Sequence, residues 1–122
     1  MEMGSLAVDQ EAGEEAVVVR VHGDVDSSTV DELIPHLNTG LQLAGKHPAR
    51  LLIVDLQPVT FFGSAALNAV LECHEGGQQA GTSVRLVADH NHVLTPIQVT
   101  ELDRVLDVYP TVSDALQGKQ QQ

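Results

Sequence analysis

The chain has 122 residues, enough for one domain with its own core and too few for two of ordinary size. It carries 6 basic and 17 acidic residues, a formal net charge of −11, which leaves no basic patch for phosphates and disfavours nucleic-acid binding. No stretch approaches the roughly 18 apolar residues of a membrane span, and residues 1–15 do not resemble a signal peptide. We therefore expect a cytoplasmic protein that binds another protein, one with a basic face.

The N-terminal segment differs in composition from the rest of the chain. Residues 1–15 contain five acids and no Lys or Arg, and we expect an acidic tail or a first strand around Leu6–Val8. A single domain should then occupy residues 16–117, followed by a flexible end at residues 118–122. The β-branched run Val17–Val21 predicts a strand that ends at His22 and Gly23.

The first helix is expected after a turn at Gly23–Asp26. Thr29 to Glu32 fits a capping box, in which the Glu32 carboxylate reaches back to the backbone of Thr29. Pro35 removes a backbone donor, so we expect a kink or an irregular turn between Asp31 and Pro35. Helical spacing predicts one apolar face, formed by Val30, Leu33, Ile34, Leu37 and Leu41.

The centre of the chain predicts a buried strand, a short apolar turn and a second helix. Leu51–Leu56 is apolar except at Asp55, as in a central strand covered by helices, and the side chain of Asp55 is expected to hold the turn at Pro58–Phe62. The helix should begin at Ser64, whose hydroxyl would cap it, and end near Glu75 because Gly76 and Gly77 follow. One stripe is apolar and includes a buried thiol at Cys73; the opposite stripe, with Ala65, Asn68, Glu72 and Glu75, should face solvent.

The C-terminal third contains two further predicted strands and a short helix. Ser83–Val87 predicts a strand, whereas Pro96 should keep Asp89–Glu101 irregular. Val105–Tyr109 is expected as the last strand, and Thr111–Leu116 as a terminal helix. Because strands alternate with helices, the sequence predicts an α/β domain with helices packed on a sheet.

Three stretches, in order along the chain, form a recognisable pattern. Gly23-Asp24-Val25-Asp26 places a Gly, an apolar residue and an Asp before the first helix. Asp55 to Leu67 follows the pattern Asp-Leu-x-x-Val-x-Phe-x-Asp-Ser-Ser-Gly-Leu, and Leu102 to Leu116 supplies Leu-Asp-x-Val-Leu, an aromatic residue and a short helix. With this spacing, the chain from about Val17 to Leu116 resembles the STAS domain of bacterial anti-sigma factor antagonists.

This resemblance implies a fold and a mechanism. The fold is a single domain with a mixed β-sheet covered by helices on one face. In the mechanism, the unmodified antagonist binds an anti-sigma factor with serine kinase activity and so releases a sigma factor. Phosphorylation at the start of the second helix breaks the complex, and a phosphatase restores it.

The resemblance also assigns candidate site residues. Alignment on Phe61 and Leu67 places the phosphorylated serine at Ser64. The candidate partner-binding residues are Asp24, Asp26, Gly63, Ser64, Asn68 and Glu72. For Asp24 and Asp26, hydrogen bonding to the local backbone of a turn is an equally good interpretation.

The chain departs from the family pattern around the serine. Gly63 stands where the family often has Asp, Ala65 replaces a second Ser, and Ala66 replaces Gly. Only one hydroxyl is therefore available in this segment.

Catalysis is not expected. Gly63-Ser64-Ala65-Ala66 lacks the last Gly of a hydrolase nucleophile elbow, and the chain has no dinucleotide-binding or Walker motif. His90 and His92 lack an ordered third ligand, so we expect surface residues and no metal or cofactor. Two alternatives remain: a non-switching STAS module that serves as a subunit of a transport or signalling complex, and a small-molecule-binding domain.

Overall fold

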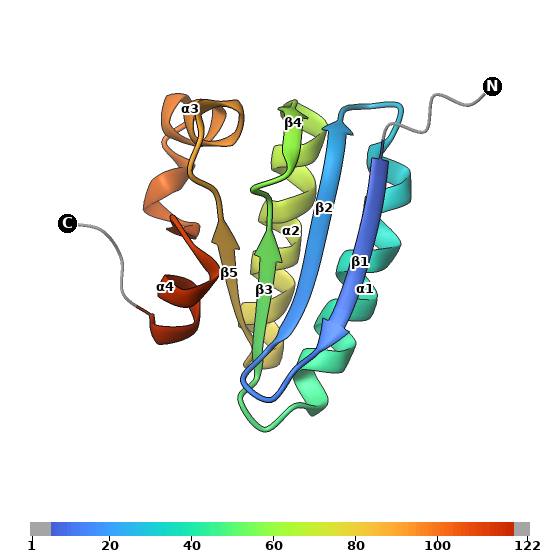
Figure 1. The fold of residues 1–122 in the computed structure, drawn as a ribbon, viewed down its shortest axis with the longest axis vertical. Helices are drawn as coiled ribbons and strands as arrows, with labels where there is room; N and C mark the ends of the chain where they lie inside the picture. The colour runs from blue at the N-terminus through green and yellow to red at the C-terminus, as the bar shows by residue number, and fades with distance from the viewer. Residues whose placement is uncertain (1–5, 119–122) are drawn as a thin grey trace.

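The computed structural model describes residues 6–118, which form one mixed α/β domain (Figure 1). Six strands form one sheet in the order β1-β2-β3-β5-β6, with β4 paired to β2 beyond the end of β3. β1 is antiparallel to β2, and all other pairings are parallel. The strands are β1 (Leu6–Ala12), β2 (Val17–Val25), β3 (Leu51–Asp55), β4 (Val59–Phe62), β5 (Ser83–Val87) and β6 (Asp107–Tyr109). The predicted fold class is thereby confirmed.

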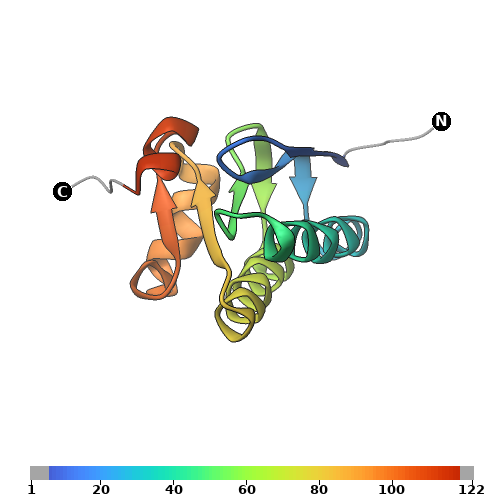
Figure 2. The same cartoon turned by 90° about the horizontal axis from the view of Figure 1, so that it is seen from below.

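The helices lie mainly on one face of this sheet. They are α1 (Val30–Lys46), α2 (Ser64–Ala80), α3 (Asn91–Val99) and α4 (Val112–Gln117), with a 3₁₀ turn at Leu102–Arg104. Helices α1 and α2 pack side by side on one face, and α4 covers part of the other face over β3, β5 and β6 (Figure 2). Alternate strand residues divide accordingly: Leu52 and Val54 enter the main core beneath α1 and α2, whereas Leu51 and Ile53 belong to the smaller cluster beneath α4.

Strand β2 has two successive parallel partners. Its first half pairs with β3, from Val17 opposite Leu52 to Arg20 opposite Asp55, and its second half pairs with β4. The predicted turns at Gly23–Asp26 and Pro58–Phe62 are therefore wrong, since most of both segments lies in strands. Each supplies the backbone partners that the other needs, and the side chains of Val25, Val59 and Phe62 are buried.

Strand β1 extends from Leu6 to Ala12, beyond the predicted Leu6–Val8. It pairs antiparallel with β2 over its whole length, from Leu6 opposite Gly23 to Ala12 opposite Val17. Leu6 and Val8 pack against the main core. Because side chains alternate along a strand, Asp9 points to the other face of the sheet. The acidic segment thus contributes a half-buried edge strand; residues 1–5 lie outside the described residues.

Helix α1 runs without a break from Val30 to Lys46, so the irregular turn predicted near Pro35 is not observed. Pro35 has no N–H to donate to the Asp31 carbonyl. Both residues are exposed, so water can satisfy that carbonyl and the helix continues. Of the predicted apolar face, Val30, Leu33 and Leu37 are buried and the other two members are half-buried.

Helix α2 continues five residues past the predicted end, through Gly76 and Gly77 to Ala80. It ends at Gly81, which adopts φ +76°, a left-handed conformation suited to glycine. Gly77 is required for another reason: a Cβ atom there would lie 2.7 Å from the Thr82 carbonyl oxygen and 2.7 Å from Val84 Cγ2. This glycine therefore permits close packing of α2 on β5 and does not terminate the helix.

The segment expected to be irregular because of Pro96 contains helix α3. Its buried residues Val93 and Ile97 hold it against the core. Pro96 has no N–H to donate to the His92 carbonyl, but His92 is exposed, so water can satisfy that carbonyl. Strand β6 is shorter than predicted and begins at Asp107. Helix α4 follows Thr111, whose hydroxyl caps it by accepting a hydrogen bond from the Asp114 N–H at 3.0 Å. Of the predicted flexible end, residues 119–122 lie outside the described residues.

We predict opposite effects for alanine at the two adjacent glycines of α2. Gly77→Ala should lower the free energy of unfolding by about 1–3 kcal/mol, because the new methyl group overlaps the Thr82 carbonyl oxygen and the Val84 side chain. Gly76→Ala is the matched control, because its Cβ would meet only Leu41, at 3.5 Å. This substitution should stabilise the helix by up to about 1 kcal/mol, since alanine favours the helix more than glycine does. Urea denaturation of both variants measures the difference, and equal midpoints would contradict the packing argument.

Candidate functional site

The start of α2 lies beside the end of β2. Asp24 pairs with Phe61 and Val25 with Phe62, and the Gly63 N–H then donates to the Val25 carbonyl at 3.0 Å. The β2–β4 pairing thus brings segments 24–26 and 61–64 to the same edge of the sheet. Four of the predicted site residues lie on these two segments.

Ser64 is the first helical residue of α2, and the predicted capping by its hydroxyl is wrong. The N-cap is Gly63, whose extended backbone (φ −88°, ψ −175°) leads into the helix, and no side chain caps this end. The Ser64 side chain is exposed and has no hydrogen-bond partner within residues 6–118. Its hydroxyl is therefore free to react or to make contacts with another molecule.

The surroundings of Ser64 favour an added negative charge. The first turn of α2 contains no acidic residue, and the first backbone bond within this end of the helix runs from the Leu67 N–H to the Gly63 carbonyl at 3.0 Å. The N–H groups of Ser64, Ala65 and Ala66 consequently have no partner within the helix. These groups and the positive end of the helix dipole attract anions.

Phe61 is a site residue that the sequence interpretation used only for alignment. Its side chain is 51% exposed, unusual for a large aromatic residue, and it adjoins the glycine that precedes Ser64. A Cβ atom on Gly63 would lie 3.0 Å from Phe61 Cε2. The ring thus occupies the space that a larger residue at position 63 would need. The sequence could have predicted this exposure, because adjacent residues of a strand point to opposite faces and one of Phe61 and Phe62 must face away from the core.

Asp26 holds the turn that precedes α1. The predicted capping box is wrong, because Thr29 is the N-cap and no side chain caps this end of the helix. The Asp26 carboxylate accepts hydrogen bonds from the Ser28 N–H at 2.9 Å and the Thr29 N–H at 3.2 Å, and also from the Ser28 hydroxyl. These bonds, led by that of the Ser28 hydroxyl, lower the pKa of Asp26 below its ordinary value. The Thr29 hydroxyl accepts from the Asp26 N–H and donates to the Asp24 carbonyl, so the loop is tied from both sides.

Asp24 is held by the neighbouring strand. Its carboxylate accepts a hydrogen bond from the hydroxyl of Thr60 on β4, which is an exposed contact across the two strands. Asp26 therefore makes the local backbone bonds of one of the two interpretations, whereas the Asp24 carboxylate bonds to a side chain on another strand. Their carboxylates also remain at the surface, beside the start of α2.

Asn68 and Glu72 continue the surface that begins at Ser64. The three residues follow at intervals of four along α2, so they lie on one side of the helix, and all three are exposed. The predicted buried stripe faces the other way, and it includes Cys73 and His74. Burial raises the pKa of the Cys73 thiol to about 12, which leaves it protonated and unreactive at neutral pH.

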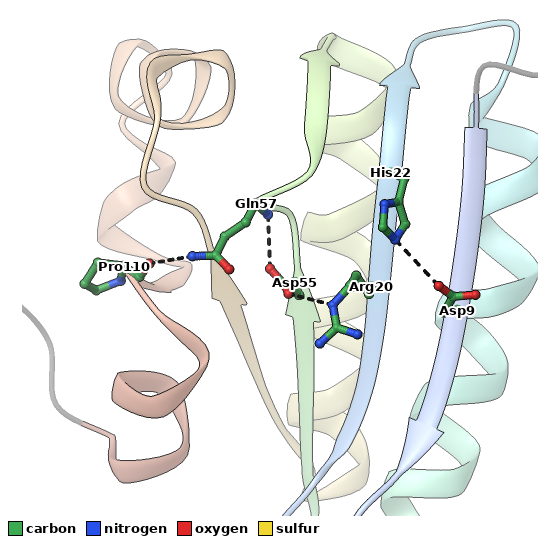
Figure 3. A network of polar contacts seen from close by, with 6 residues as sticks. All are labelled: Asp9, Arg20, His22, Asp55, Gln57 and Pro110. Carbon is green, nitrogen blue, oxygen red and sulfur yellow. Dashed lines mark hydrogen bonds and ion pairs between the residues drawn. The ribbon is translucent and has the colours of Figure 1, made fainter.

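A polar network lies on the opposite face of the sheet (Figure 3). Arg20 Nε donates to the buried Asp55 carboxylate at 3.0 Å, and the same carboxylate accepts from the Gln57 N–H at 3.1 Å. The Gln57 side chain reaches the Pro110 carbonyl, and the His22 ring lies 3.6 Å from the Asp9 carboxylate. Asp55 thus holds the chain after β3, as predicted, and this network links strands at a distance from Ser64.

The structure also shows the surroundings of the two histidines that were weighed as metal ligands. The His90 ring contacts the Gln57 carbonyl at 2.9 Å and packs edge-on against His92, with 5.2 Å between ring centroids. Within residues 6–118, no group of three or more His, Cys, Asp or Glu side chains is arranged to hold a metal ion. In the same part of the chain, every helix is too short or too polar to cross a bilayer.

Comparison with known proteins now identifies the family. The family model of the STAS domain matches residues 7–115, nearly the whole described chain. The chain belongs to the STAS domain family. The resemblance inferred from the sequence is thereby confirmed, and the match begins within β1.

Solved structures of other STAS proteins are similar over almost the full chain. An anti-sigma factor antagonist from Mycobacterium paratuberculosis is 27% identical, with a TM-score of 0.85 and 96% of each chain covered. The anti-sigma factor antagonist SpoIIAA in its unphosphorylated form is 19% identical (TM-score 0.69; 92% of this chain and 97% of SpoIIAA covered). Bacillus SpoIIAA in its phosphorylated form is 18% identical (TM-score 0.65; 92% and 98% covered). At these identities, the likeness to SpoIIAA concerns the fold.

We predict that the Asp26 carboxylate stabilises this STAS domain by holding the turn that leads into α1. Asp26→Ala should lower the urea midpoint at pH 7. Because the pKa of Asp26 is lowered on folding, this contribution is fully present above the ordinary value of 3.8 and is lost as the pH falls through the folded-state pKa. The midpoints of the parent and the variant should therefore approach each other as the pH falls below 3.8.

Asp26→Asn provides the control for this measurement. Its side-chain oxygen keeps the acceptor for the Ser28 and Thr29 N–H groups but carries no charge. The variant should retain most of the stability and show no loss of its own in this pH range. A constant difference between parent and Asp26→Ala at every pH would contradict the stabilising role of the ionised carboxylate.

Proposed function

We propose that this STAS domain is an anti-sigma factor antagonist that acts in the cytoplasm by binding. Its partner is an anti-sigma factor with serine kinase activity, and binding releases a sigma factor. Phosphorylation of Ser64 by the partner ends the interaction, and a phosphatase restores it. The observation that carries the proposal is the exposed, unpartnered hydroxyl of Ser64 at the start of α2. The similarity to anti-sigma factor antagonists over the whole chain supports it.

The proposed contact surface surrounds that hydroxyl. It consists of Gly63, Ser64, Asn68 and Glu72, with Asp24 and Asp26 at its edge and Phe61 beside the serine. Exposed aromatic residues commonly supply a large share of binding energy when a partner buries them. The acidic residues add a negative field that would attract a partner with a basic face.

A phosphate on Ser64 should leave the fold intact. It adds about −1.5 to −2 charges and three acceptor oxygens at a helix end with free N–H groups. The helix dipole favours such a charge by about 0.3–1 kcal/mol. The carboxylates of Asp24 and Asp26 oppose it, but both make their contacts at the exposed surface, where solvent screens the repulsion. Phosphorylated SpoIIAA, which has the same fold, supports this compatibility.

The complex should be far more sensitive than the fold. A partner that covers Ser64 would have to desolvate a dianion or supply matching cations. An unmatched buried charge costs several kcal/mol, and about 1.4 kcal/mol already lowers affinity tenfold. One modification can thus dissociate the complex without unfolding the domain.

We predict distinct results for two substitutions at the serine. Ser64→Ala should keep binding to the anti-sigma factor but abolish incorporation of phosphate on incubation with that kinase and ATP. Ser64→Glu should keep the melting temperature within about 2 °C while lowering affinity about tenfold or more, since its carboxylate mimics part of the phosphate charge. Intact-mass spectrometry with site mapping and calorimetric titration measure these outcomes.

Ser83→Ala serves as the matched control, because Ser83 is exposed at the start of β5, away from the α2 surface. It should change neither phosphorylation nor binding. Binding without phosphate transfer to the parent chain by any candidate kinase would reject the switch and favour the non-switching STAS subunit.

We also predict that Phe61 contributes to the contact. Phe61→Ala should weaken binding of the anti-sigma factor about tenfold or more, because a buried aromatic anchor would be lost. The effect on domain stability should be small, since half of the side chain is already exposed. Val99→Ala, which truncates another exposed apolar side chain, at 76% exposure, should leave affinity unchanged. Equal affinities for all three proteins would exclude Phe61 from the interface.

A further inference from the structure

The structure contains a hollow of about 450 Å³ that none of the proposed Ser64 contacts lines. It lies where β5 and β6 end, between α3, the 3₁₀ turn Leu102–Arg104 and the last strand. Carboxyl ends of parallel strands are the usual position for ligands in α/β sheets. The volume falls in the range of small-molecule sites, about 300–1,000 Å³.

The lining of this hollow combines an apolar floor with an acidic rim. Ala88, Ile97 and Leu106 are at most 3% exposed and form the floor. Asp89 and Asp103 are exposed and belong to the segments that follow β5 and α3, so they lie at the opening. An occupant would therefore place an uncharged body inside and its polar end at the rim.

The charge of the rim restricts the occupant further. Neither Lys nor Arg is among the lining residues, and the adjacent Arg104 points its guanidinium to Glu101 at 3.8 Å. Two carboxylates without a matching cation repel phosphates and carboxylates, which disfavours nucleotides. They attract an ammonium or guanidinium group. Gln98, also in the lining, adds a carbonyl oxygen that can accept from such a group.

We propose that this hollow binds a small organic cation: an amine or guanidine attached to a compact apolar body. The apolar part lies against Ile97 and Leu106, and the cationic group lies between Asp89 and Asp103. The proposal concerns a second site and does not depend on the function assigned to Ser64.

The test compares two probes that share a phenylethyl body and carry opposite charges, 2-phenylethylamine and 3-phenylpropanoate, titrated into the full chain labelled with ¹⁵N. The amine should produce saturable shifts of backbone amides confined mainly to residues 88–109, with a dissociation constant of about 1–10 mM. The carboxylate should produce none. Asp89→Asn combined with Asp103→Asn should weaken binding of the amine about tenfold.

The matched control removes two charges elsewhere. Glu14→Gln with Glu15→Gln lies in the exposed connection between β1 and β2, at the opposite end of the sheet (Figure 1), and should leave the amine affinity unchanged. Equal effects of the two double variants would mean general attraction of cations to an acidic protein and would overturn the proposal. So would non-saturable shifts, or equally strong binding of the carboxylate probe.

Discussion

The position of Ser64 depends on the parallel pairing of β4 with the second half of β2. This pairing buries Val25 and Phe62 and sets the hydrogen bond from the Gly63 N–H to the Val25 carbonyl. The pairing also sets the direction in which α2 leaves the sheet, because the N-cap Gly63 directly follows the last residue of β4. A free turn in place of β4 would leave the first helical residue without a fixed relation to Asp24 and Asp26.

Under the proposed function, a serine at the first helical position would separate the stability of the domain from its regulation. Because Gly63 provides the N-cap, the Ser64 hydroxyl is not used in holding the helix, and its modification removes no structural hydrogen bond. The free N–H groups nearby tolerate negative charge in the isolated domain. In the proposed complex, the phosphate would also face the surface of the partner. Without cationic groups on that surface to match it, the phosphate would weaken the complex and leave the domain folded.

Both proposed sites lie where the parallel strands end. At this edge the chain leaves the sheet in surface loops, so polar side chains there remain in contact with water. The two sites differ in chemistry: the start of α2 accepts an anion, whereas the hollow between α3 and β6 has an acidic rim. The domain thus presents opposite electrostatic preferences within one edge, in a chain that is acidic overall.

The sequence alone determined the features that depend on local composition. Apolar runs predicted β3 and β5, helical periodicity predicted the faces of α1 and α2, and the motif around Ser64 indicated the family. The tertiary structure decided where elements end and which groups cap them. Gly77 lies within α2 because β5 packs against it, and β4 exists because β2 offers it a partner. The physical reason is that strand ladders and close contacts join residues distant in the chain, whereas periodicity records only the neighbours of each residue.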